Sequence, residues 1–402
     1  IRLSLVGSEM CIRDRGDPAR GTLSTMTQPK SPLESSGTGR SGPRDATGSR
    51  LRVGVLGSAG QVGRSLVREI EAAADLELAF AVTRAELDLA DTASIDPWLD
   101  GELDATRERA SDRGTDRHSV ADVVLLAAAY TKVDACETQR ELAHQLNARV
   151  PGEWARALHA RGIGFIHLST DYVFPGDGTR PYREDDPTGP HSVYGESKLE
   201  GERLVLANDP GALVVRTSWV FGPGRNFVLA ILDQAAKRRT GEKSGPLQVV
   251  VDQQGCPTAA ADLAQGLLSL CRLRALSRSD LRGLLHLCNA GVTTWFGFAR
   301  EILDQAGYGD VAIDPVATGT FPTAARRPAY SVLDCSRARG LGVELRPWTA
   351  ALAGYLAGPD RPTDLICTAG TPGPGSDSSP NPSASSSSSD SSFDRVRRKV
   401  SH

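Results

Sequence analysis

Two short polar segments in the middle of the 402-residue chain carry side chains suited to proton transfer. The first contains Thr170 within the sequence STDYVF, and the second, YGESK, runs from Tyr194 to Lys198. Residues four apart share one face of a helix, so the Tyr194 phenol and the Lys198 ammonium would lie one above the other. A nearby cation favours phenolate, so we expect Lys198 to lower the pKa of Tyr194 and make it a proton donor and acceptor near neutral pH. The Thr170 hydroxyl would add a third polar group.

The same spacing also occurs in helices whose tyrosine is packed and whose lysine is solvated, so a catalytic interpretation needs a cofactor site elsewhere in the chain. A glycine-rich turn provides one. An apolar run that begins at Leu51 ends in three glycines and continues into a stretch with helical character up to Ala74. This order predicts a strand, a tight turn and a helix, where the backbone approaches a pyrophosphate and the helix N-terminus meets its charge. The predicted contacts are Gly57, Gly60, Gln61, Val62 and Gly63.

The glycine spacing G-x-x-G-x-x-G, followed by Tyr-x-x-x-Lys, resembles the extended short-chain dehydrogenase/reductase family. Within that family, the chain is similar to the dTDP-4-dehydrorhamnose reductases from about Leu51 to Ala357. The segments that carry this resemblance occur in the order typical of those enzymes. They are GSAGQVG (57–63), LDL (87–89), AAAYTKVDACE (127–137), STDYVF (169–174), VYGESKLEGE (193–202), RTSWV (216–220), NF (226–227), DQQGCPT (252–258), TTW (293–295) and RP (327–328).

This resemblance implies hydride transfer from a nicotinamide to C4 of a 4-keto-6-deoxy nucleotide sugar, while Tyr194 supplies a proton to the ketone oxygen. It further implies that Lys198 holds the nicotinamide ribose and that Thr170 orients the carbonyl oxygen through a hydrogen bond. Strand register favours Thr170 over the adjacent Ser169, because neighbouring strand residues point to opposite faces. The substrate contacts that the resemblance implies are Thr131, Val133, Thr170, Asp171 and Trp219.

Three polar or aromatic positions have an ordinary structural role as an alternative. Asp171 either hydrogen-bonds a sugar hydroxyl or caps the turn that follows it. Trp219 either lines the sugar pocket or packs in the core. Asn226 either binds substrate or caps the helix that it opens, and the capping role is favoured.

The residues after the second predicted strand bear on the choice of dinucleotide. An acidic side chain there would accept the ribose 2′-hydroxyl of NAD, whereas a basic one would pair with the 2′-phosphate of NADP. Arg84 occupies this place, so the prediction is NADPH, with NADH as the alternative. Some family members also carry magnesium held by glutamates, but no residue here matches closely enough to assign a metal ligand. The resemblance implies further cofactor contacts at Asp88, Leu89, Ala127, Ala128 and Ala129.

The elements around these motifs predict an α/β fold, a doubly wound, Rossmann-like parallel sheet with a smaller C-terminal α/β substrate lobe. Short apolar runs alternate with helical patterns, which is typical of a parallel sheet covered on both faces. Ligands of such sheets bind beyond the carboxyl ends of the strands, and the motifs above follow strand ends. The predicted sheet strands are 53–56, 76–82, 123–128, 164–168 and 213–217. The predicted lobe elements are helices 227–239, 261–276, 295–306 and 348–357 and strands 247–251 and 284–287.

We therefore divide the chain into four parts. Residues 1–50 are interpreted as a non-native or disordered leader, 51–222 mainly as the NAD(P)-binding domain, 223–360 mainly as the substrate lobe, and 361–402 as a disordered Ser-rich tail. The polar stretch 100–119 is interpreted as a solvated insertion and 237–245 as an exposed loop.

Composition narrows the class of protein. A net charge of −3 and a pI near 6.2 give no bias towards nucleic acid, and no apolar run is long enough to span a membrane. The seven cysteines lack C-x-x-C spacing, which favours free thiols over a metal site or disulfides. We expect a cytoplasmic enzyme with a nucleotide-sugar substrate, no nucleic-acid or membrane partner, and an assembly compatible with a homodimer.

Two other functions share these motifs. The first is a sugar-nucleotide epimerase or 4,6-dehydratase of the extended family, which keeps the same three side chains but retains its NAD. A dehydratase usually has an acidic pair next to the catalytic threonine, whereas in this chain Thr170 is followed by Asp171 and Tyr172. The second alternative is a non-catalytic regulatory subunit similar to that of methionine adenosyltransferase. The intact Tyr194 and Lys198 favour catalysis.

Overall fold

The computed structural model describes residues 50–112, 119–276 and 281–360. The predicted tail, nearly all of the predicted leader, and residues 113–118 of the predicted insertion lie outside these ranges.

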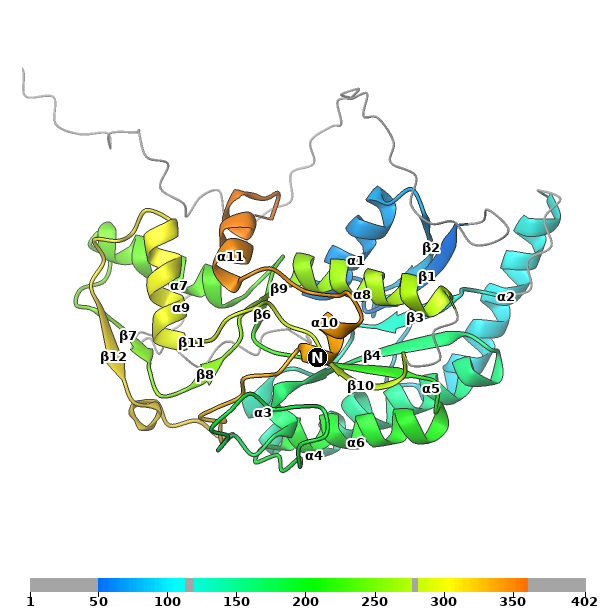
Figure 1. The fold of residues 1–402 in the computed structure, drawn as a ribbon, viewed down its shortest axis with the longest axis horizontal. Coiled ribbons are helices and arrows are strands. Elements are labelled where there is room, and N and C mark those ends of the chain that lie inside the picture. Colours follow the sequence, from blue (N-terminus) through cyan, green and yellow to red (C-terminus); the bar gives the residue numbers. More distant parts are fainter. Residues whose placement is uncertain (1–49, 113–118, 277–280, 361–402) are drawn as a thin grey trace, which may run out of the picture. The chain divides into compact units, whose positions relative to one another are not determined.

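Six parallel strands form the sheet that organises the described chain (Figure 1). They lie in the order β10-β5-β4-β3-β1-β2, and every neighbouring pair is parallel. β3 and β5 are buried along their whole length, as expected for strands covered on both faces. The Rossmann-like prediction is confirmed. The strands are β1 (Leu51–Leu56), β2 (Leu76–Val82), β3 (Val123–Leu126), β4 (Gly164–Thr170), β5 (Leu213–Thr217) and β10 (Gly283–His286).

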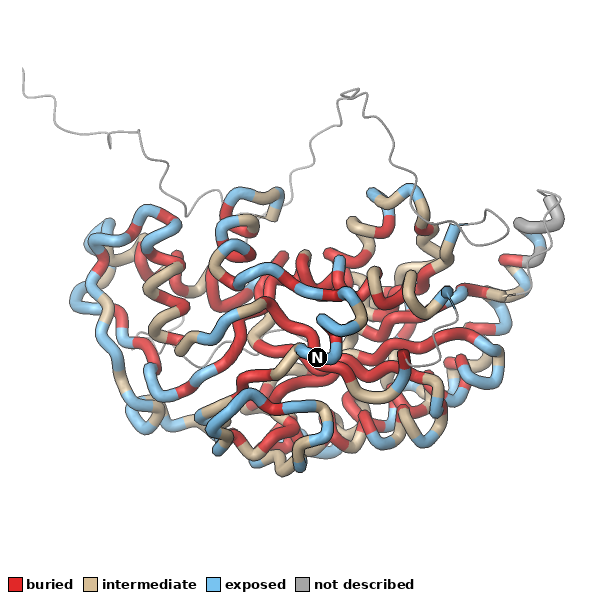
Figure 2. Tube along the Cα trace, viewed as in Figure 1, coloured by how far each residue is buried: buried red, intermediate tan, exposed pale blue. Residues whose placement is uncertain are grey.

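Helices cover both faces of this sheet, and Figure 2 shows the buried residues concentrated along the strands between them. α1 (Gln61–Ala72) and α8 (Ala260–Ala275) pack together on one face, and α5 (Val150–Ala160) and α6 (Val193–Asn208) pack together on the other. Successive β3 residues alternate between the two hydrophobic cores: Val123 belongs to the first and Val124 to the second. This period of two is what a strand between two layers of helices requires.

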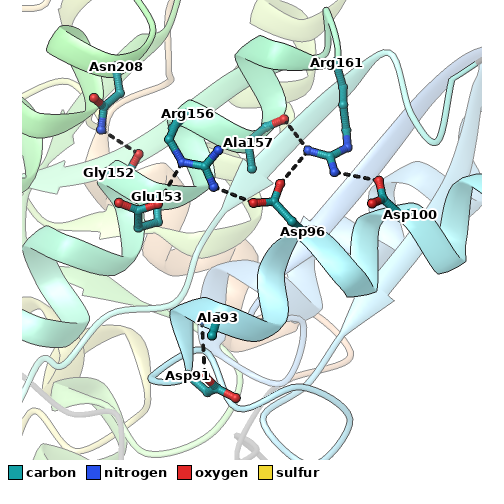
Figure 3. A network of polar contacts seen from close by, with 10 residues as sticks. All are labelled: Asp91, Ala93, Asp96, Asp100, Gly152, Glu153, Arg156, Ala157, Arg161 and Asn208. Atoms are coloured by element: carbon teal, nitrogen blue, oxygen red, sulfur yellow. Dashed lines mark hydrogen bonds and ion pairs between the residues drawn. The ribbon is translucent and has the colours of Figure 1, made fainter.

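The predicted insertion is largely helical. α2 runs from Ile95 to Asp112, so residues 100–112 of this stretch continue a helix, and its interpretation as a solvated insertion stays a prediction. Arg161, the C-cap residue of α5, binds Asp96 at 2.7 Å and Asp100 at 2.6 Å, and Arg156 of α5 binds Asp96 at 2.6 Å (Figure 3). These ion pairs connect α2 to α5 along their exposed sides, where each exposed pair contributes about 0–1 kcal/mol.

The remaining elements form a smaller α/β lobe with its own apolar core. Its helices are α7 (Phe227–Arg239), α9 (Trp295–Gln305) and α11 (Trp348–Ala357), and its strand pairs are β7 (Leu247–Val250) with β12 (Ile313–Val316), β8 (Gln254–Gly255) with β11 (Thr293–Thr294) and β6 (Val220–Phe221) with β9 (Thr258–Ala259). Short helices α3 (Val133–Thr138) and α4 (Arg140–His144) lie near α6, and α10 (Ser336–Gly340) contacts β10.

Two elements within the range assigned mainly to the substrate lobe contribute to the main sheet instead. β10 pairs with β5 as the edge strand, and α8 packs against α1. Their apolar side chains complete the core on that face, with Leu267 and Leu285 fully buried. Residues 223–360 therefore contribute to the main sheet as well as to the smaller lobe. The division at residue 222 between an NAD(P)-binding domain and a substrate lobe stays a prediction.

Candidate active site

A cavity of about 190 Å³ lies where the carboxyl ends of β1, β3, β4 and β5 meet the smaller lobe. The strands are parallel, so the residues that follow them gather at one edge of the sheet. The three side chains with predicted catalytic roles share this cavity with most of the predicted binding residues. The predicted site residues that line it are Gly60, Gln61, Val62, Ala127, Ala129, Thr131, Val133, Thr170, Asp171, Tyr194, Lys198 and Trp219.

The glycine-rich turn at the end of β1 is shaped to receive a phosphate group. Gly57 has a φ of +87°, and a Cβ placed on it would lie 2.7 Å from the Ala128 nitrogen. A Cβ on Gly63 would lie only 2.2 Å from the Gly57 oxygen, so both positions require glycine. No side chain caps the first turn of α1, whose N-cap is Gly60, so the positive end of this helix faces the cavity with uncapped amides.

The start of α6 brings Tyr194 beside Thr170. Ser192 caps the helix by accepting a 3.2 Å hydrogen bond from the Gly195 amide. A Cβ on Gly195 would lie 2.3 Å from the Tyr172 oxygen, which shows how closely the helix approaches the turn after β4. Tyr194 and Thr170 therefore line the same cavity, where burial raises the pKa of Tyr194 and hydrogen bonding by Thr170 acts against this rise.

Lys198 is buried one turn further along the same helix, with only 2% of its surface exposed. Its ammonium donates to the Leu168 carbonyl at 2.6 Å and lies 3.3 Å from Nε2 of the buried His167. Tyr194 and Lys198 thus face one cavity, as their spacing predicts.

Burial controls the pKa values of these two side chains. It raises the pKa of Tyr194 above its usual value, and it lowers the pKa of Lys198 to about 8, although Glu202 acts in the opposite direction on Lys198. The prediction that Lys198 lowers the pKa of Tyr194 is therefore wrong, because removal of the phenol from water dominates and the ammonium is directed at the Leu168 carbonyl. Tyr194 keeps its proton at neutral pH.

Asp171 is the one acidic residue among the described residues that line this cavity, and 2% of its surface is exposed. Its Oδ1 accepts a 2.9 Å hydrogen bond from the Thr170 hydroxyl, and its Oδ2 accepts one of 3.0 Å from the Ser218 hydroxyl. Burial raises the pKa of Asp171 to about 6, against hydrogen bonds from Ser331, Thr170 and Ser218 that lower it. The capping alternative is wrong for Asp171, since the following turn is capped by Thr170, whose hydroxyl accepts from the Tyr172 amide at 3.3 Å.

Trp219 forms one wall of the cavity and also packs against the core of the smaller lobe, while its contact with a sugar stays a prediction. It is the one non-glycine position in the described ranges with a positive φ, +46°. Its indole stacks on Trp295, with ring centroids 3.6 Å apart and planes inclined by 6°. Trp295 is held in turn by a 3.1 Å hydrogen bond from its Nε1 to Gln253.

Asn226 has the favoured capping role. Its Oδ1 accepts a 3.1 Å hydrogen bond from the Leu229 amide at the start of α7, and its Nδ2 donates to the Tyr355 hydroxyl at 3.0 Å. It is buried and is not among the residues that line the cavity.

The remaining predicted cofactor residues lie outside the cavity lining. Arg84 is exposed just after β2, and nearby the Thr83 amide and hydroxyl each donate to Glu86 at 2.8 Å. The sequence analysis did not single out this carboxylate beside Arg84. Asp88 is exposed and accepts a 3.1 Å hydrogen bond from the Ala90 amide. The predicted residues that do not line the cavity are Gly57, Gly63, Arg84, Asp88, Leu89 and Ala128.

Several cavity residues were missed by the sequence analysis. The Ser169 and Thr217 hydroxyls are buried without a hydrogen-bond partner, and Ser218 holds Asp171. The sequence held a signal for these three residues, because they directly follow or end the predicted strands 164–168 and 213–217. The structure places the ends of these strands side by side, with Thr170 in register with Thr217. The aromatic wall from the smaller lobe had no comparable signal. The missed lining residues are Leu168, Ser169, Tyr172, Thr217, Ser218, Val220, Phe221, Phe227, Trp295 and Phe298.

Within the described ranges, no cluster of three or more His, Cys, Asp or Glu side chains is arranged to hold a metal ion. The five cysteines in these ranges are free thiols, with the Cys288 and Cys335 sulfurs 3.4 Å apart. None of the described helices has the length and apolar character that a bilayer crossing requires.

Residues 51–359 match the family model of the RmlD substrate binding domain. A dTDP-4-dehydrorhamnose reductase of Mycobacterium tuberculosis H37Rv is 38% identical over 322 residues, which cover 78% of this chain and 95% of the relative. A probable dTDP-4,6-dihydroxy-2-methyloxan-3-one 4-ketoreductase of Streptomyces antibioticus is 38% identical over 301 residues, 74% of this chain and 92% of the relative.

Solved structures with the same fold include two reductases. A dTDP-4-dehydrorhamnose reductase of Clostridium acetobutylicum superposes with a TM-score of 0.64 at 31% identity, over 76% of this chain and 99% of that one. The reductase of Bacillus anthracis, solved in complex with NADP, gives a TM-score of 0.63 at 29% identity, over 77% of this chain and 99% of that one.

Proposed function

This chain belongs to the RmlD substrate binding domain family, and we propose that it reduces the 4-keto group of dTDP-4-dehydro-L-rhamnose to give dTDP-L-rhamnose, with NADPH as the reductant. The observation that carries the proposal is the convergence of Thr170, Tyr194 and Lys198 on one cavity beside the glycine-rich turn. The names of the Mycobacterium and Streptomyces relatives support a keto reduction on a dTDP-sugar.

The dinucleotide fits the turn between β1 and α1. The amides at the start of α1 would hold its pyrophosphate, and Gly57 and Gly63 leave room for the backbone to approach it. The bound nicotinamide supplies a hydride to C4 of the sugar. Arg84 supports NADPH, and the NADP in the Bacillus anthracis enzyme supports the same choice, whereas Glu86 beside Arg84 would repel a 2′-phosphate.

Tyr194 supplies the proton to the ketone oxygen. Its pKa is raised by burial, so the phenol arrives protonated, and negative charge on it is then opposed by the Lys198 ammonium in the same cavity. Trp219, Thr131 and Val133 would bound the space for the sugar.

Simple reduction is favoured over dehydration. Thr170 is followed by Asp171 and Tyr172, which do not form the acidic pair that a dehydratase uses. Both oxygens of Asp171 already accept hydrogen bonds within the protein, from Thr170 and Ser218. A homodimer and a cytoplasmic location stay predictions.

The test is an assay with dTDP-4-dehydro-L-rhamnose and NADPH, in which loss of nicotinamide absorbance is followed and dTDP-L-rhamnose is identified by chromatography. We expect oxidation of one NADPH for each ketone reduced, and none with dTDP-glucose, which has no ketone. A folded sample that binds NADPH yet leaves the ketone unreduced would contradict the proposal. Release of tightly held NAD from the purified protein would instead favour an epimerase or dehydratase.

A further inference from the structure

We infer that Asp171 is a positioning residue that sets the direction of the hydrogen-bond chain through Thr170 to Tyr194, and that efficient ketone reduction requires Asp171 in its protonated form. The inference rests on the proposed reduction and deepens it. It assigns to Asp171 a role that acts through Thr170, in place of a contact with the sugar.

The argument begins with the single proton of the Thr170 hydroxyl. An ionised carboxylate can only accept hydrogen bonds, so in the observed 2.9 Å contact the Thr170 proton points to Asp171. The Thr170 oxygen then has only lone pairs to offer: it accepts from the Tyr172 amide at 3.3 Å, and it could only accept from the Tyr194 phenol, which lines the same cavity. The chain would run from Tyr194 through Thr170 to Asp171, which directs the phenol proton at Thr170 and away from the ketone.

A protonated Asp171 reverses this chain. Its carboxyl proton can be donated to the Thr170 oxygen, the Thr170 proton then points to the Tyr194 oxygen, and the Tyr194 proton is directed at the ketone. As C4 gains the hydride, the electron pair of the carbon–oxygen π bond takes up the Tyr194 proton. The Tyr194 oxygen recovers a proton from Thr170, and Thr170 recovers one from Asp171, which is left ionised until solvent protonates it again. Every proton lost at one oxygen is gained at the next.

The surroundings of Asp171 allow both charge states. Ser218 hydrogen-bonds the carboxyl group, Ser331 lowers its pKa, and Tyr194 and Cys256 interact with it electrostatically. The Lys198 ammonium is directed at the Leu168 carbonyl and His167 instead. With burial raising the pKa of Asp171 to about 6, the two forms exchange within the working pH range of an enzyme.

The first test compares the pH profile of kcat for the wild type and Asp171→Asn. The wild-type kcat for ketone reduction should fall about tenfold per pH unit above the apparent pKa of Asp171. An asparagine amide donates to Thr170 at every pH, so the variant should lose this alkaline limb and exceed the wild-type kcat at pH 8. Asp185→Asn is the matched control, because that side chain is 84% exposed, and it should keep the wild-type profile.

Ser218→Ala gives a second, milder test in which Asp171 is kept. Removal of the Ser218 hydrogen bond takes away support for the ionised carboxylate, so the alkaline limb should move to higher pH. This variant decides the matter if Asp171→Asn fails to fold.

A contact with the sugar predicts a different result. If Asp171 serves only to hold substrate, Asp171→Asn should raise KM and leave the pH profile of kcat unchanged, which would overturn the inference. An unmoved limb in Ser218→Ala would overturn it as well. A wild type that does not oxidise NADPH with the ketone would overturn the proposed function itself, whereas an active wild type with unaltered variant profiles overturns only the role of Asp171.

Discussion

Removal from water sets the charge states of the three titratable side chains around the reacting position. Burial disfavours the charged form of each group, so it raises the pKa of Tyr194 and Asp171 and lowers that of Lys198. A neutral phenol is the form that a reductase needs, since the proton must be present before the ketone arrives. The local environment thus prepares Tyr194 for donation.

Tyr194→Phe should lower kcat by at least about 100-fold, because the only change is loss of the proton that the ketone oxygen receives. The ring stays, so its edge-to-face contact with Tyr172 and the affinity for NADPH should change little. Steady-state kinetics and fluorescence titration with NADPH measure the two effects. Full activity in the variant would place the proton donor elsewhere.

Asp171 should also affect stability, with a sign that follows from its raised pKa. The folded protein disfavours the ionised carboxylate, so stability is fully present below the unfolded pKa near 3.8 and is lost as pH rises through about 6. Asparagine does not ionise, and Asp171→Asn should therefore gain up to about 3 kcal/mol relative to the wild type between pH 4 and pH 7. Urea denaturation at several pH values measures this difference, which should stay constant for Asp185→Asn.

At the scale of elements, the segment after β5 holds one wall of the cavity under backbone strain. Trp219 keeps a φ of +46° because its indole is stacked on Trp295 and is backed by Gly255, where a Cβ would lie 2.4 Å from the indole. Gly255 of β8 and Trp295 at the start of α9 therefore fix the shape of a cavity wall that belongs to another part of the chain.

Gly255→Ala should displace the Trp219 indole and raise KM for the nucleotide sugar by about tenfold, or roughly 1.4 kcal/mol, while NADPH affinity stays close to that of the wild type. Gly319→Ala is the control, since a Cβ there meets no atom within 4 Å. An unchanged KM for Gly255→Ala would show that the indole does not bound the sugar.

At the scale of the whole molecule, the six-stranded sheet and its helical layers are completed by residues that come late in the chain. α8 and β10 supply buried leucines to the core on one face of the sheet, and β10 is one edge of that sheet. The two halves of the sequence therefore depend on each other for folding.

A fragment of residues 51–222 should fail to fold cooperatively, because it leaves the β5 edge and the α1 face without partners. A fragment of residues 51–360 should fold. Circular dichroism and thermal melting compare the two, and a cooperative transition in the shorter fragment would show that the first half is an independent domain.

Local chemistry determined much of this protein from its sequence. Glycines at 57 and 63, the four-residue spacing of Tyr194 and Lys198, and the capping role of Asn226 are set by backbone geometry over a few residues, so they could be read directly. The alternation of short apolar runs with helical patterns likewise predicted the parallel sheet, since a strand covered on both faces must be apolar throughout.

Only the tertiary structure decided the aromatic wall of the cavity, the edge strand of the sheet and the pKa of Tyr194, because these features depend on contacts between residues far apart in the chain. The stack of Trp219 on Trp295 joins positions 76 residues apart, and β10 reaches β5 across a similar separation. The pKa of Tyr194 was mispredicted for the same reason: sequence spacing reveals the nearby lysine, whereas the extent of burial depends on how α6, β4 and the smaller lobe pack around the phenol.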